Sequence, residues 1–183
     1  KRCCLIEYWR LLFWQEPPPT VKGGAEVWLT GTACGLKRLG HEIGWLQTPH
    51  IERALDTFKP DVVIMGTLHC FIGLDHVRWL ADQNVPAAWM LHDYWPFCHP
   101  RMLMRDNNRS DRPCEAVDGS CRDSGGLRGE SNVALVNRFF PVTGCDGAAQ
   151  IFRRNGVNVR VAAEEGIDTE MFRPGPKGLA TDV

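Results

Sequence analysis

Three groups of residues in this chain could do chemistry. The first is a glycine pair, Gly23 and Gly24, which follows a lysine and precedes Ala25 and Glu26. Glycines let the backbone approach an anion closely, and the free N–H groups at the start of a helix attract one. Neither the dinucleotide fingerprint G-x-G-x-x-G nor the P-loop pattern is present. The pair therefore predicts either a phosphate-binding loop or a tight turn from a strand into a helix.

The second group lies where a buried strand is expected to end. His92 and Asp93 follow an apolar run and precede the aromatic residue Tyr94. A histidine can hold a phosphate or a hydroxyl by hydrogen bonding, and an aspartate can orient either partner. The alternative is that the pair only caps the strand end. His69, after the preceding apolar run, carries the same two interpretations.

The third group consists of sulfur and imidazole side chains in one polar segment. Cys98, His99, Cys114 and Cys121 could provide the four ligands of a structural zinc site. However, the segment contains no C-x-x-C pair, and the spacing matches no compact zinc finger. A disulfide between Cys114 and Cys121 is an alternative in an oxidised preparation, and free thiols are the simplest expectation in the cytoplasm. We therefore expect no bound metal.

The composition narrows the class of protein. With 183 residues, 44% hydrophobic and 23% charged, the chain is long enough to bury a core and suits one globular domain spanning 1–183. The net charge of −1 and the absence of basic runs argue against a nucleic-acid partner. No stretch reaches the roughly 18 apolar residues of a membrane span, and no secretion signal is apparent. We expect a cytoplasmic protein.

Short apolar runs alternate with helical patterns along the chain. Such runs are typical of strands covered on both faces, and here they predict strands at 9–14, 43–46, 62–65, 87–91, 140–142 and 159–162. Amphipathic patterns predict helices at 25–39, 51–58, 74–84 and 145–155. This alternation predicts a Rossmann-like α/β domain, in which a parallel sheet carries helices on both faces.

One segment interrupts the alternation. Residues 96–132 show little periodicity and many polar residues, which predicts a long loop insertion. It follows the fourth strand, and ligands of open parallel sheets bind beyond the carboxyl ends of the strands, so we expect it to overhang the binding crevice. Outside this segment, Cys34, Cys70 and Cys145 are interpreted as small buried hydrophobic residues.

Five stretches of the chain together resemble a known family. They are PPPTVKGGAE, LKRLGHEIGWL, FKPDVVIMGTLH, VPAAWMLHDYWPFC and GIDTEMFRP, and they occur in this order between about residues 9 and 174. In this order they resemble the amino-terminal half of a retaining GT-B glycosyltransferase of the large family-four type. LHDYWPFC is the most specific of the matching segments.

The resemblance implies roles for individual residues. Gly23 and Gly24 match the glycine loop that lies against the donor phosphates and the acceptor in the family, and Glu26 follows them in the same motif. His92 and Asp93 match the pair that faces the transferred sugar or the acceptor hydroxyl. They are the catalytic candidates.

Further binding candidates follow from the same resemblance. His69 matches a histidine of relatives with a similar LHDYWPLC-like ending, and Asp168 ends the Gly-Ile-Asp motif that closes this half. Tyr94 either stacks on a sugar ring or lipid-linked acceptor, or packs in the core. Glu165 departs from the family pattern, where many members have asparagine, and would oppose an anionic donor unless it points away.

The implied activity is hexosyl transfer from a nucleotide-sugar donor, a UDP- or GDP-sugar, to a glycan or lipid-linked acceptor with retention of configuration. The setting typical of the family is polysaccharide biosynthesis, with possible peripheral association at the inner membrane face. No cofactor is required. A carboxy-terminal donor domain, which provides most nucleotide contacts in this architecture, is absent from the sequence, so we expect this fragment to be inactive alone.

Two other classes of function remain open. One is a stand-alone, non-catalytic module that binds a glycan or a partner. The other is an unrelated nucleotide-binding domain with a Rossmann-like fold that shares only the glycine turn.

Overall fold

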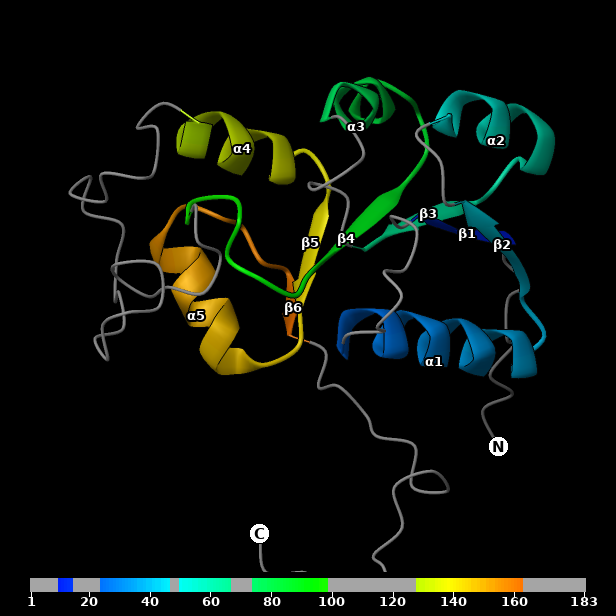
Figure 1. The fold of residues 1–183 in the computed structure, drawn as a ribbon, viewed down its shortest axis with the longest axis horizontal. Helices are drawn as coiled ribbons and strands as arrows, with labels where there is room; N and C mark the ends of the chain where they lie inside the picture. Colours follow the sequence, from blue (N-terminus) through cyan, green and yellow to red (C-terminus); the bar gives the residue numbers. More distant parts are fainter. Residues whose placement is uncertain (1–9, 15–23, 47–49, 67–73, 99–127, 163–183) are drawn as a thin grey trace, which may run out of the picture.

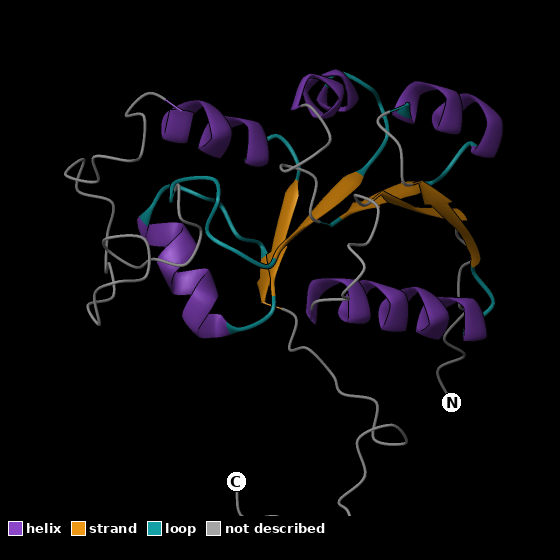
Figure 2. Ribbon diagram, viewed as in Figure 1, coloured by secondary structure: helices purple, strands orange, loops and turns teal. Residues whose placement is uncertain are grey.

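The computed structural model describes residues 10–14, 24–46, 50–66, 74–98 and 128–162, and the structural statements below concern these residues. Their strands and helices alternate along the chain (Figures 1 and 2). In chain order the elements are β1 (Arg10–Trp14), α1 (Gly24–Arg38), β2 (Glu42–Leu46), α2 (Ile51–Phe58), β3 (Val62–Met65), α3 (Leu74–Ala81), β4 (Ala87–Leu91), α4 (Arg128–Val136), β5 (Phe140–Thr143), α5 (Asp146–Arg154) and β6 (Val161–Ala162).

The strands form one six-stranded sheet in the order β2-β1-β3-β4-β5-β6, and all neighbouring pairs are parallel. The chain moves outward from β1 to β2 and then returns past β1 to β3. Right-handed crossovers then place α1 and α2 on opposite faces of the sheet. In Figure 1, α1 lies below the sheet and α2, α3 and α4 lie above it. The predicted Rossmann-like α/β fold with a parallel sheet is confirmed.

The larger core cluster lies on the face that carries α2 to α5, which we call the four-helix face. Alternate residues of the strands, such as Leu12, Val63 and Met65, point into it because successive side chains of a strand face opposite sides. The helices contribute buried residues from all four elements: Ile51, Val77, Leu80, Leu135, Val136, Ala149 and Phe152. Trp89 of β4 is fully buried in this cluster.

The opposite face carries a smaller cluster, and we call it the α1 face. Leu11 and Phe13 of β1 pack there against Leu29 and Ala33 of α1. The helix ends at Arg38, one residue before the predicted end, and the predicted stop residue Gly40 follows with a φ of 96° that suits glycine.

Several boundaries differ from the sequence-based predictions. The segment 96–132 is not all loop, because α4 begins at Arg128 and the turn at 96–98 packs in the core. Only the end of α4 is apolar enough to show periodicity, which is why its pattern is weak. The third predicted helix ends at Ala81 rather than at residue 84. Cys34 and Cys145 are exposed, so their prediction as buried residues is wrong, and Cys70 lies outside the described residues.

Candidate functional site

The candidate site lies at the carboxyl edge of the sheet, where the parallel strands end. β3, β4 and β5 end there at Met65, Leu91 and Thr143. α1 and α3 leave the neighbouring strands β1 and β3 toward opposite faces, so this edge contains a topological switch point. In open parallel sheets, ligands bind outside the carboxyl ends of the strands at such a point.

Hydrogen bonds connect the ends of these strands. The indole Nε1 of Trp89 donates to the carbonyl of Gly66, just after β3, at 3.0 Å in a buried position. The hydroxyl of Thr143 donates to the carbonyl of Leu91 at 3.2 Å, also buried. Since buried hydrogen bonds of this kind are costly to break, β3, β4 and β5 present a stable platform for the residues that follow them.

His92, the first residue after β4, lies against the start of α1. Its imidazole and the indole of Trp28 meet edge to face, with ring centroids 5.6 Å apart and an interplanar angle of 64°. The Nε2 atom of His92 is screened from solvent. Trp28 lies in the second turn of α1, which begins at Gly24. The contact therefore brings the glycine end of α1 and His92 together at one edge of the sheet.

The start of α1 has the electrostatic character of an anion site. The first four N–H groups of an α-helix have no partner within the helix, and the positive end of the helix dipole lies there. Gly24 is exposed and a Cβ atom there would meet no described atom within 4 Å. Glu26 lies half-buried in the first turn and adds a negative charge to this region. The arrangement could hold a phosphate if Glu26 contacts a hydroxyl rather than the anion.

Asp93 caps a turn at the strand end. Its Oδ1 accepts a hydrogen bond from the backbone N–H of Trp95 at 3.2 Å. Within the same turn the N–H of Cys98 donates to the carbonyl of Tyr94 at 2.8 Å. The capping interpretation of Asp93 is thus confirmed, while its catalytic role stays a prediction. The cap orders the backbone directly after His92.

The aromatic residues after Asp93 pack inward. The Tyr94 ring lies 5.2 Å from the Phe152 ring of α5, and Trp95 lies 5.3 Å from Trp89. Burial raises the pKa of the Tyr94 phenol, and the electrostatic influence of the nearby Cys145 raises it further. Tyr94 therefore stays neutral and can donate a hydrogen bond at the edge of the site.

Cys145 is a residue of this edge that the sequence analysis misread. It is the exposed N-cap of α5, and its Sγ accepts a hydrogen bond from the N–H of Ala148 at 3.4 Å. Its position just before the helix, with Asp146 in the first turn, was the available signal. Trp28 was also missed, because no local pattern indicates a contact with a residue 64 positions away.

The remaining predicted site residues have different outcomes. Cys98 is only 6% exposed and packs in the core cluster, so its assignment to the polar loop insertion 96–132 is wrong. Among the described residues, no group of three or more His, Cys, Asp and Glu side chains is arranged to hold a metal ion. The other predicted positions lie outside the described residues: Gly23, His69, His99, Cys114, Cys121 and Asp168.

None of the helices in the described part of the chain is long and apolar enough to cross a membrane. Comparisons with known proteins give no match: no protein-family model and no curated protein sequence matches this chain.

Proposed function

We propose that this chain is the acceptor-side half of a retaining GT-B glycosyltransferase, which acts together with a carboxy-terminal donor domain. The contact between Trp28 and His92 is the observation that carries this proposal. It packs α1, the helix that begins at Gly24 of the glycine motif, against the histidine after β4. Gly24 and His92 are 68 residues apart in sequence, yet both lie at the edge where parallel sheets bind ligands.

In the proposed reaction the bond between the sugar C1 and the donor phosphate breaks, and a bond from C1 to the acceptor oxygen forms on the same face. The leaving phosphate takes the acceptor proton. The start of α1 stabilises charge on the diphosphate, and His92 positions the transferred sugar by hydrogen bonding. Trp28 restricts the orientation of the imidazole, and the Asp93 cap holds the backbone that carries it.

The test uses the natural full-length chain that contains these residues, incubated with UDP- and GDP-sugars while nucleotide release is measured. His92→Ala should reduce kcat at least about 100-fold, as losing one well-placed charge-stabilising group does in other enzymes. The matched control is His41→Ala, a partly buried histidine between α1 and β2 at the opposite edge of the sheet, which should leave kcat unchanged.

Trp28 variants separate positioning from packing. Trp28→Phe keeps an aromatic edge against His92 and should retain more activity than Trp28→Leu at equal thermal stability. Absence of turnover with every nucleotide sugar, or full turnover by His92→Ala, would contradict the proposal. Tight nucleotide binding by residues 1–183 alone would instead support an unrelated nucleotide-binding domain.

A further inference from the structure

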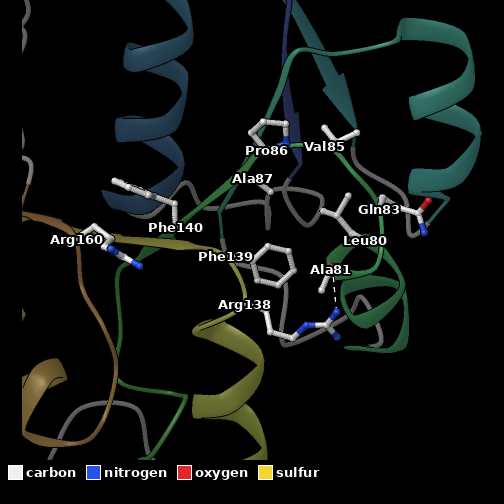
Figure 3. A pocket seen from close by; sticks show the side chains of 10 residues that line it. All are labelled: Leu80, Ala81, Gln83, Val85, Pro86, Ala87, Arg138, Phe139, Phe140 and Arg160. Atoms are coloured by element: carbon white, nitrogen blue, oxygen red, sulfur yellow. Dashed lines mark hydrogen bonds between the residues drawn. The ribbon is translucent and has the colours of Figure 1, made fainter.

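A hollow opens at the amino edge of the sheet, between the first residues of β4 and β5, and thus at the opposite end of the strands from the candidate site (Figure 3). Its volume is about 270 Å³. Its lining is mixed, with apolar side chains such as Leu80 and Phe139 beside the polar side chains of Gln83, Arg138 and Arg160. Small-molecule sites usually have roughly 300–1,000 Å³. The hollow therefore suits one or two protein side chains better than a substrate or cofactor.

Neighbouring contacts hold the hollow in shape. The Phe139 ring meets the buried Trp89 ring edge to face at 5.6 Å. The guanidinium of Arg138 donates to the carbonyl of Ala81 at 3.0 Å and pairs with Asp82 at 2.5 Å. The first of these two bonds is the dashed line in Figure 3. A surface that is already ordered loses less conformational entropy when a partner binds.

Arg160 gives the rim a positive charge that no carboxylate of the described residues balances. It lines the hollow on the other side of Phe139 from Ala81 (Figure 3), and it is exposed. Within the described ranges no carboxylate pairs with Arg160, whereas the charge of Arg138 is balanced by Asp82. A ligand that brings one carboxylate would therefore match the charge of this rim.

Phe140 adds exposed apolar surface to the same rim. It begins β5 and its side chain is 45% exposed, which is high for a large hydrophobic residue. Aromatic residues and arginines are enriched at the centres of protein–protein interfaces, where they contribute most of the binding energy. Anionic membranes, in contrast, are recognised by clusters of roughly four to eight basic residues. One free arginine beside a phenylalanine fits a protein partner better.

We propose that this hollow docks an acidic segment of a partner protein. The segment places an aliphatic or aromatic side chain against Phe140 and a carboxylate on Arg160, which lie on the same side of Phe139 (Figure 3). Because the hollow and the candidate site lie at opposite edges of the sheet, the partner and the substrates bind at the same time. The proposal holds whether or not the chain is a glycosyltransferase.

The test selects binders to the natural full-length chain from a random peptide library. The selected peptides should carry Asp or Glu next to an apolar residue. Their affinity should fall at least about tenfold in Arg160→Glu and in Phe140→Thr, as expected for the centre of an interface. The matched control is Arg53→Glu on α2, another exposed arginine without an ion pair among the described residues, which should bind the peptides like the wild type.

Both rim variants should keep the melting temperature of the wild type, which separates lost binding from lost folding. A library that yields no binder would overturn the proposal, as would peptides without acidic residues or peptides that bind Arg160→Glu equally well. A second experiment measures binding of the chain to vesicles of phosphatidylcholine with phosphatidylglycerol. If the chain binds them and Arg160→Glu abolishes that binding, the rim is a membrane contact and the proposed protein partner is wrong.

Discussion

Within the described part of the chain, four helices cover one face of the sheet, and α1 alone covers the other (Figure 1). The four-helix face holds a cluster of 16 buried residues, and the α1 face holds a cluster of 4. Since burial of apolar surface is the main favourable term in folding, most of the stability should come from the four-helix face.

The candidate site depends on the thinner face. α1 carries Gly24 at its start and Trp28 against His92, yet only Leu29 and Ala33 of this helix are buried. Elements with few buried apolar contacts open locally at a lower free energy than the core. The helix that would bind the ligand is therefore held less firmly than the helices that stabilise the fold. Four substitutions and two control variants measure how much individual contacts on the two faces contribute to stability. All of them are measured in the natural chain.

Phe152→Ala on the four-helix face should have the largest effect. The ring is 1% exposed and contacts the rings of Tyr94 and Phe97 at 5.2 and 5.6 Å. Removing it leaves a cavity enclosed by ordered neighbours, so we expect a loss of about 4 kcal/mol in the free energy of unfolding. Equilibrium urea unfolding measures this loss.

Phe13→Ala makes the same change on the α1 face. Phe13 is fully buried, but the ring it meets at 5.1 Å is that of Trp45, whose side chain is 45% exposed. Trp45 is free to collapse into the space, so the expected loss is smaller, about 3 kcal/mol. An equal or larger loss than that of Phe152→Ala would contradict the comparison of the two faces.

Gly44→Ala should destabilise the packing of α2 on β2. A Cβ atom at this position would lie 3.1 Å from the Phe58 ring and 3.2 Å from Leu12. Such overpacking typically costs about 1–3 kcal/mol of unfolding free energy. The matched control is Gly31→Ala in α1, where a Cβ atom meets no described atom within 4 Å. There alanine should stabilise by about 0.5–1 kcal/mol, because it favours a helix more than glycine does.

The smallest effect concerns the pair of Glu52 and His76, which joins α2 to α3 with Oε1 and Nδ1 3.2 Å apart. Partial burial raises the pKa of Glu52, but its backbone hydrogen bond, the bond with His76 and the charges of His76 and His50 together lower the pKa below its usual 4.5. A carboxyl group with a lowered pKa in the folded state stabilises the fold above its unfolded pKa. This stabilisation disappears as the pH falls through the folded value.

Because both side chains of this pair are more than a third exposed, we expect only about 0.3 kcal/mol. Urea unfolding between pH 6 and pH 3, values chosen to bracket the usual carboxyl pKa of about 4.3, should show a shallower decline for Glu52→Gln than for the wild type. Identical profiles would show that the pair makes no contribution to stability. Asp56→Asn, an exposed carboxylate on the same helix, is the control.

The buried strands were predictable from local pattern. β3 and β4 have the boundaries that the sequence predicts, because a continuous run of apolar residues leaves little choice when both faces are covered. α2 also has its predicted boundaries, because its amphipathic pattern is that of a helix. α4 was not predictable in the same way. It begins with the polar stretch Arg-Gly-Glu-Ser-Asn, and the residues 132–136, whose burial the structure describes, are buried at Leu135 and Val136 in the last turn.

Some features of the candidate site were also predictable from the sequence, and others were not. The position of His92 and Asp93 after a strand follows from the sequence, and so does a helix that begins at the glycine pair. The exposure of Cys34 and Cys145 could not be predicted from the sequence, because cysteine is usually buried. Their exposure depends on how each helix is oriented on the sheet.

Local chemistry is enough to determine the alternation of strands and helices and the residues at the strand ends, because hydrophobic periodicity and turn residues act over a few positions. The strand order, the unequal cover of the two faces and the contact of Trp28 with His92 were decided by the tertiary structure. They depend on where β1 and β4 lie in one sheet, and side chains distant in sequence meet only after the helices cross over it.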